Sequence, residues 1–218
     1  MQRLTPLIYG SFVCAMFLAT LFCVGGLLVG PIVLETVDTS AVGAEPARQP
    51  GAADAVDDPL AEFLAEPQRK RLSLKGLVVT DADLARLNRL PELRFLSLDG
   101  TAITDAGLAH LEGLTQLRSL NLNATQITDE GIKRLGALKD LRTLCLDETG
   151  ITDHGLIEVA RLRKLEWLYL NGVDVTDAGM RHLVPLGQLK FLAVLDTRVT
   201  SRGVHELHRA VPTLRVRR

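Results

Sequence analysis

Apolar residues recur at a fixed spacing of 24 positions from residue 72 onward. Two columns hold only leucine, and three further columns, which begin at Leu74, Val79 and Leu87, hold only leucine, isoleucine or valine. The two leucine columns are Leu93, Leu117, Leu141, Leu165 and Leu189, and Leu72, Leu96, Leu120, Leu144, Leu168 and Leu192. A fixed period between 20 and 50 residues indicates one small structural unit stacked on copies of itself.

Within each unit the apolar spacing changes from two residues to three. Residues 96–98 alternate as Leu-Ser-Leu, which is the pattern of a half-buried strand. Leu108, Leu111 and Leu114 then recur every third residue, as on one face of a helix. Each unit therefore predicts a strand, a turn and a helix, which together form one coil of a solenoid.

A Thr-Asp pair precedes the predicted helix of five units, and Thr200-Ser201 continues the column. The pairs are Thr80-Asp81, Thr104-Asp105, Thr128-Asp129, Thr152-Asp153 and Thr176-Asp177. Such side chains cap free N–H groups, and a negative charge suits the helix dipole. A calcium site is the alternative, but it needs six to eight oxygen ligands. We therefore expect capping, and we expect the glycine two residues later to let helix and strand backbones approach closely.

This pattern resembles the leucine-rich repeat family, L-x-x-L-x-L-x-x-(N/C/T)-x-(I/L), over residues 67–218. Thr101, Thr125, Thr149 and Thr197 stand where the family usually has Asn or Cys, while Leu77 and Val173 depart from it. The T-D-x-G ending resembles the cysteine-containing or ribonuclease-inhibitor-like subclass. The resemblance implies an α/β fold: a right-handed solenoid of six units, with a parallel sheet on the concave side and helices on the convex side. A last strand can follow within Val211–Arg218.

The N-terminal segment is apolar, and residues 4–34 contain no charged side chain. About 20 apolar residues are enough to cross a bilayer as a helix, so residues 1–34 are predicted to form a transmembrane signal-anchor. A cleaved signal peptide is the alternative. Arg3 precedes the run, whereas the next basic residue is Arg48. This asymmetry predicts a single-pass protein with a cytoplasmic N-terminus and the repeats outside the cytoplasm.

Charge divides the rest of the chain into two zones. Residues 35–66 hold eight acidic groups and one basic group, a net charge of −7, whereas residues 67–218 hold 23 basic and 18 acidic groups, a net charge of +5. Residues 35–58 are rich in Ala, Asp, Pro and Gly and predict a disordered acidic tether. Residues 59–66 predict a short capping helix with Asp58 at its N-cap. The near-zero charge of the whole chain argues against nucleic-acid binding.

In leucine-rich repeat proteins, the strand side chains that face away from the core form the usual binding surface. Trp167, the only tryptophan of the chain, falls on this face with Tyr169 and Phe191, and Trp and Tyr are enriched at binding hot spots. The candidate protein-binding residues are Phe95, Asp99, Asn121, Asn123, Thr143, Cys145, Asp147, Trp167, Tyr169, Asn171 and Phe191.

No pattern in the sequence indicates catalysis or a bound cofactor. Cys145 has no evident His–Asp partner, and Walker, G-x-S-x-G and H-E-x-x-H motifs are all absent from the sequence. The five histidines fall in the predicted helices, and His205 and His208 lack a third metal ligand. Three cysteines cannot form a disulfide framework.

The sequence therefore predicts a monomeric, membrane-tethered repeat module that binds an unknown protein or peptide and contains no metal, cofactor or catalytic site. Three alternatives stay open at this stage. The chain can be a secreted repeat protein after signal cleavage, or an adaptor or substrate-recognition subunit of a modifying complex, although an F-box would need about 40 helical residues before the repeats. In the third, the acidic and basic zones attract each other within the chain.

Overall fold

The computed structural model describes Asp58 and residues 60–218. The predicted signal-anchor 1–34 and nearly all of the predicted tether 35–58 lie outside the described residues. No helix in the described part of the chain has both the length and the hydrophobicity that a membrane crossing requires.

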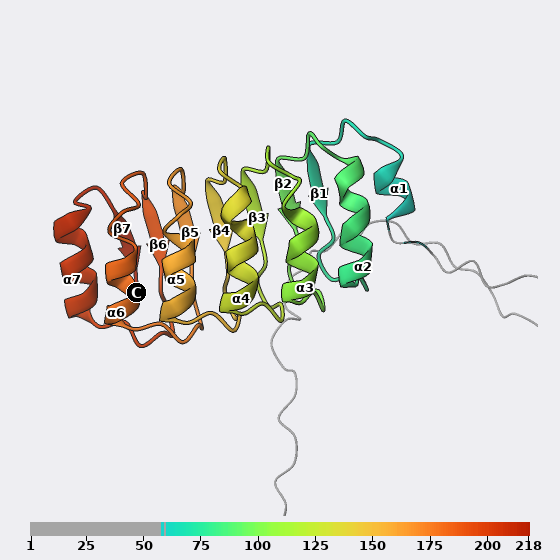
Figure 1. Cartoon of the computed structure of the whole chain (residues 1–218). Helices are drawn as coiled ribbons and strands as arrows, with labels where there is room; N and C mark the ends of the chain where they lie inside the picture. Colours follow the sequence, from blue (N-terminus) through green and yellow to red (C-terminus); the bar gives the residue numbers. More distant parts are fainter. Residues whose placement is uncertain (1–57, 59) are drawn as a thin grey trace, which may run out of the picture. The chain divides into compact units, whose positions relative to one another are not determined.

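The repeats form one parallel sheet whose strands follow each other in chain order (Figure 1). Each strand is three residues long, and each pairs with the next at an offset of 24 residues, as in Leu96 with Leu120. The seven strands of the described residues are β1 (Arg71–Ser73), β2 (Phe95–Ser97), β3 (Ser119–Asn121), β4 (Thr143–Cys145), β5 (Trp167–Tyr169), β6 (Phe191–Ala193) and β7 (Arg215–Arg217). The six predicted units and the last strand are thus present.

Short helices line one face of this sheet, and no other helix or strand of the described residues covers the opposite face (Figure 1). The first three units have a four-residue α-helix that continues as a 3₁₀-helix, whereas the last three have one longer α-helix. These are α2 (Asp81–Leu84) with η1 (Ala85–Arg89), α3 (Asp105–Leu108) with η2 (Ala109–Leu111), α4 (Asp129–Ile132) with η3 (Lys133–Ala137), α5 (Asp153–Val159), α6 (Asp177–His182) and α7 (Ser201–Ala210). Each of these α-helices begins at the second residue of its Thr-Asp or Thr-Ser pair, and the threonine is the N-cap residue.

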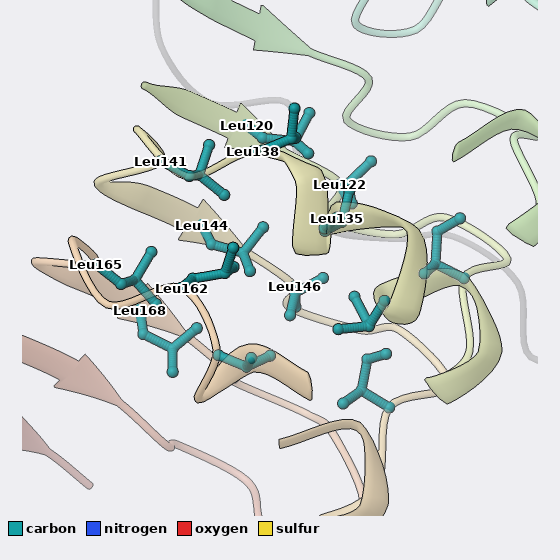
Figure 2. Packing of buried hydrophobic residues seen from close by; sticks show 14 of the residues in the cluster. Leu120, Leu122, Leu135, Leu138, Leu141, Leu144, Leu146, Leu162, Leu165 and Leu168 are labelled. Atoms are coloured by element: carbon teal, nitrogen blue, oxygen red, sulfur yellow. The ribbon is translucent and has the colours of Figure 1, made fainter. Parts of the chain in front are cut away.

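The leucine columns fill the space between the sheet and the helices. Leu120, Leu144 and Leu168 stack from rung to rung beneath the strands, with Leu135 and Leu162 opposite them (Figure 2). Each is at most 1% exposed. Full burial of a leucine side chain contributes about 2 kcal/mol, and it is obtained here only when a neighbouring rung supplies the other wall. The predicted core is therefore confirmed.

The aspartate column joins neighbouring rungs and does not cap its own helices. The carboxylate of Asp105 accepts hydrogen bonds from the backbone N–H of Thr128 at 2.8 Å and from its hydroxyl at 2.6 Å, both in the next rung. Thr128 in turn accepts from Glu130 N at 3.4 Å, so threonine is the capping residue. The same clamp joins Asp81 to Thr104, Asp129 to Thr152, Asp153 to Thr176 and Asp177 to Thr200.

The glycine column makes room for these clamps. A Cβ placed on Gly131 would overlap Asp105 Oδ1, and one on Gly179 would overlap Asp153 Oδ1. The expectation that glycine brings helix and strand backbones together is therefore wrong. Because glycine has no side chain, the aspartate carboxylate of the preceding rung can lie against it.

The two ends of the array explain why the Thr-Asp-x-Gly pattern changes there. In the described residues, no rung precedes Thr80 that could supply an aspartate. Asp83, which stands at the glycine position of the same unit, takes over this role: its carboxylate accepts hydrogen bonds from the Thr80 N–H at 2.9 Å and from the Thr80 hydroxyl at 2.8 Å. Ser201 stands at the aspartate position of the last unit. Its hydroxyl accepts a hydrogen bond from Arg218 at 2.7 Å.

A short helix, α1 (Ala61–Leu64), covers the first rung (Figure 1). It is shorter than the predicted range 59–66, and its N-cap is Leu60. Asp58 instead accepts from Leu60 N at 3.0 Å, and both of its oxygens bind the Arg86 guanidinium at 2.7 and 2.6 Å. Leu60 is fully buried, so this segment closes the end of the hydrophobic core.

Candidate functional site

The side chains that leave the sheet on the side opposite the helices form a surface that we call the open strand face. Strand register brings residues of successive rungs side by side in two columns. The first column is Arg71, Phe95, Ser119, Thr143, Trp167, Phe191 and Arg215, and the second is Ser73, Ser97, Asn121, Cys145, Tyr169, Ala193 and Arg217. Because the flanking leucines are buried, these columns carry the residues that differ between rungs.

Trp167, Tyr169 and Phe191 meet on β5 and β6, as the sequence predicts. The ring centroids of Trp167 and Phe191 lie 5.6 Å apart, and those of Tyr169 and Phe191 lie 5.4 Å apart, both in tilted geometry. Trp167 is 40% exposed. Burial raises the pKa of Tyr169, and the nearby Cys145 and Asp147 add to this effect, so its hydroxyl stays protonated at neutral pH. We call these three residues the aromatic patch.

The predicted polar neighbours of this patch form a ladder along the edge where the strands end. Asn123 Oδ1 accepts from Asp147 N at 2.9 Å, and Asp147 Oδ1 accepts from Asn171 N at 2.7 Å. Asn171 Oδ1 continues the ladder by accepting from Leu195 N at 2.8 Å. Much of the hydrogen-bonding capacity of these side chains is therefore used to hold successive rungs in register.

The remaining candidate residues lie toward the other end of the face. Phe95, Asn121 and Cys145 line a hollow of about 480 Å³ on β1–β4. Asp99 lies two residues after β2 and binds Lys75 at 2.6 Å. The eleven candidate residues therefore form two groups, and Thr143 on β4 lies between them.

Two features of this hollow are not among the candidate residues that the sequence predicts. The Arg71 guanidinium lies 4.2 Å from the centroid of the Phe95 ring, which is a cation–π contact. Ser73, Ser97 and Ser119 line the hollow with hydroxyl groups. Arg71 and the three serines fall in the same 24-residue columns as the candidates, so the spacing is a signal that could have identified them. The contact between Arg71 and Phe95 follows from strand register, which pairs these two residues.

Neither reactive thiols nor metal sites are found among the described residues. Burial raises the pKa of Cys145 to about 12, with Asp147 and Asp99 adding to the effect, so this cysteine is protonated at neutral pH and is a poor nucleophile. The described part of the chain contains no group of three or more His, Cys, Asp or Glu side chains placed to hold a metal ion.

Comparison with known proteins identifies the repeat. Residues 113–136, one full period, match the family model described as Leucine Rich repeat. A search among curated proteins gives no significant match.

Solved structures with the same fold include a leucine-rich repeat protein of Leptospira interrogans, with 21% identity and a TM-score of 0.53 over 71% of this chain. Internalin C2 of Listeria monocytogenes has 25% identity and a TM-score of 0.52 over 67% of this chain and 69% of its own. Another internalin of that species, inlF, has 19% identity and a TM-score of 0.52 over 71% of this chain and 49% of its own. The chain spans only 38% of the Leptospira protein. These comparisons show a leucine-rich repeat at residues 113–136 and a fold shared with leucine-rich repeat structures.

Proposed function

We propose that this chain is a membrane-tethered leucine-rich repeat module that binds a protein or peptide through its open strand face, without catalysis. The aromatic patch is the observation that carries the proposal. Trp167 is 40% exposed on a face that no element of the described chain covers. Exposed aromatic surface that is held rigid by neighbouring rings suits an interface, because little side-chain entropy is lost when a partner covers it.

The tether in this proposal rests on the sequence of residues 4–34. This run without charged side chains exceeds the length that spans a bilayer. The proposed topology places the N-terminus in the cytoplasm and the repeats outside. Fractionation of the full chain, combined with N-terminal sequencing of the mature protein, tests it. Recovery in the membrane after an alkaline wash with residue 1 intact supports the anchor, whereas a soluble protein that lacks residues 1–34 supports secretion after cleavage.

A two-step experiment tests the proposed binding role. Partners are first captured by cross-linking to the full chain, and one purified partner is then titrated against the wild type, Trp167→Ala and Ile157→Ala. Ile157 lies on α5 in the helix layer and is 42% exposed, so it is a matched control for loss of exposed apolar surface. We expect Trp167→Ala to raise the Kd by at least about tenfold, as for a hot-spot residue, and Ile157→Ala to leave it unchanged.

The outcome that contradicts the proposal is equally plain. If the purified partner binds Trp167→Ala and Phe191→Ala as tightly as the wild type, the aromatic patch is not the interface. Loss of binding by Ile157→Ala alone would place the interface on the helix layer.

A further inference from the structure

A row of basic side chains runs along the edge where the strands begin. Positions 24 residues apart, each directly before a strand, are Lys70, Arg94, Arg118, Arg142, Glu166 and Lys190. Their backbones are paired across rungs: Arg94 N donates to Lys70 O at 2.9 Å, and Arg118 N donates to Arg94 O at 2.8 Å. Adjacent members therefore lie at the strand spacing of about 4.8 Å, so a rigid backbone fixes the row.

The two ends of this row differ in how their charges are balanced. Glu166 binds Arg142 at 3.0 Å and Lys190 at 2.5 Å, so beside the aromatic patch both cations of the row share one carboxylate and a net charge of only +1 is left. Among the described residues, Lys70, Arg94 and Arg118 have no carboxylate within ion-pair distance, and the Nε of Arg94 is buried without a hydrogen-bond partner. The unbalanced cations thus gather on the first three rungs.

Each of these cations directly precedes a strand residue that lines the hollow on β1–β4: Lys70 precedes Arg71, Arg94 precedes Phe95, and Arg118 precedes Ser119. Arg71 forms part of the wall of this hollow and stays stacked on Phe95 at 4.2 Å, which holds the guanidinium in place. In the hydrogen bonds of the described residues, the hydroxyls of Ser73, Ser97 and Ser119 have no partner. The hollow therefore combines the Arg71 guanidinium with hydroxyl hydrogen-bond donors, a combination that suits carboxylates.

We propose that Lys70, Arg94 and Arg118, together with the adjoining hollow, bind an acidic peptide segment of the protein partner. This inference rests on the proposed function and specifies the chemistry of the partner. An extended acidic segment is favoured over an anionic membrane, because its side chains can enter the recessed hollow and reach the serine hydroxyls, which a flat bilayer surface cannot do. The segment must compete with Glu92, two residues before Arg94, and with Asp140, which lies close enough to Arg118 to interact with it electrostatically.

The same geometry predicts how the partner segment is arranged. From β2, at the hollow, to β5, at the aromatic patch, there are three strand spacings, or about 14 Å. An extended peptide covers this distance in about four residues. One segment can therefore place carboxylates on the first three rungs and an apolar anchor about four residues away on the aromatic patch.

Selection from random peptides tests this inference even while the partner is unidentified. Displayed peptides of about twelve residues, which span roughly 40 Å when extended, are selected on the full chain. The same selection is run on Lys70→Glu/Arg118→Glu, in which both replaced side chains are exposed. Lys133→Glu/Arg209→Glu, on the helix side, changes two exposed side chains and the net charge equally and is the matched control. Circular dichroism confirms that each variant is folded.

We expect acidic residues to be enriched on the wild type and the control, and not on Lys70→Glu/Arg118→Glu. A synthetic copy of the best acidic peptide should bind that variant at least about tenfold more weakly, the loss of roughly one charge-assisted hydrogen bond. The inference is overturned if peptides selected on the wild type contain no more acidic residues than the starting library. It is also overturned if acidic residues are enriched equally on all three proteins, or if their enrichment is lost on the control variant. Vesicles of anionic lipid that bind the wild type alone, without acidic enrichment, would assign the row to a membrane.

The selection also separates this inference from the proposed function. If aromatic and apolar residues are enriched and Trp167→Ala removes that enrichment, the open strand face binds peptides whether or not acidic residues are selected. Aromatic enrichment without acidic enrichment therefore overturns only the inference. If neither class is enriched on the folded wild type, both proposals fail.

Discussion

The two halves of the open strand face differ in chemistry although the same scaffold supports both. Toward β1 the face is a hollow lined by serines and by Arg71, whereas toward β6 it carries three aromatic rings in contact. Beneath both halves the leucine columns are buried, and the Asp–Thr clamps repeat with donor–acceptor distances of 2.5–2.9 Å. The constant columns therefore determine the solenoid, and the variable columns determine what each half can bind.

The largest effect should come from breaking a clamp, and it should be similar in both halves. Gly131→Ala and Gly179→Ala each place a Cβ against the aspartate of the preceding rung. Displacing that carboxylate sacrifices a charge-assisted hydrogen bond and leaves threonine donors unpaired, so each variant should lose about 2–3 kcal/mol of unfolding free energy. Urea denaturation measures it.

A double-mutant cycle identifies the cause of this loss. In Asp105→Ala/Gly131→Ala the obstructing carboxylate is absent, and the added methyl meets only the flexible end of Leu108, whose Cδ1 lies 3.1 Å away, so the double variant should be about as stable as Asp105→Ala alone. Strict additivity would show that glycine has another role there. A large difference between Gly131→Ala and Gly179→Ala would contradict the claim that both halves share one scaffold.

The next effect should distinguish the halves. Phe191 contacts both Trp167 and Tyr169, and each aromatic pair contributes about 0.5–1.5 kcal/mol. Phe95 is 36% exposed and stacks only on Arg71, an exposed cation–π contact of about 0.5–1 kcal/mol. Phe191→Ala should therefore lower the unfolding free energy by about 2 kcal/mol and Phe95→Ala by about 1 kcal/mol. Equal losses in urea denaturation would mean that the patch adds no stability of its own.

The fold followed from the sequence because its signals are local and repeated. The 24-residue columns located the core, the strands and the helix starts, since periodicity depends only on which residues are buried. The role of Asp105 could not be derived in this way, because its partner Thr128 belongs to the next rung. A residue at a helix start suggests a cap to the same helix, and only the stacking distance shows that its carboxylate reaches across.

The sequence predicts which residues share the open strand face, but it does not predict which of them lie together. Strand alternation placed Trp167, Tyr169 and Phe191 on one face, and the structure brings their rings together. The sequence did not separate Phe95 from them, because a column records which residues share a face and not which rungs leave a hollow. The row at Lys70 and Arg118 was visible as spacing, but its lack of ion pairs depends on side-chain distances.

A smaller effect is expected where the two halves meet. The residue after the ladder position has a left-handed backbone in all six units, with Gly76, Gly100 and Gly172 favourable there and Glu148 strained at φ 56°. A left-handed conformation costs a residue with a Cβ about 1–2 kcal/mol. Glycine removes this cost, but it also raises the conformational entropy of the unfolded chain, which offsets part of the gain in stability. Glu148→Gly should therefore raise the unfolding free energy by about 0.5–1 kcal/mol.

The reverse substitution is the control for this turn. Gly172→Ala, at φ 67°, should lower the unfolding free energy by about 1 kcal/mol or more. If thermal unfolding shows Glu148→Gly to be less stable than the wild type, the side chain of Glu148 has a favourable contact that outweighs backbone strain.

The smallest effect concerns pH at the two ends of the array. The hydrogen bond from Arg86, with that from Leu60 N, lowers the pKa of Asp58 from 3.8 to about 2. Because the folded-state pKa is the lower one, this contact stabilises the cap above pH 4, and its contribution is lost as the pH falls from 4 through about 2. Arg86→Gln should therefore lower the thermal midpoint slightly at pH 5 and by clearly less at pH 2.

Glu206 provides the matched case at the other end, where hydrogen bonds from Arg202 and Arg181 lower its pKa. Arg202→Gln should likewise lower the midpoint at pH 5 and lose that effect in acid, since a protonated Glu206 no longer pairs with either arginine. Hydrogen exchange assigns each change to its own end: α1 for Arg86→Gln and α7 for Arg202→Gln. A difference between wild type and variant that stays constant from pH 5 to pH 2 would show that the arginine acts by packing and not by its charge.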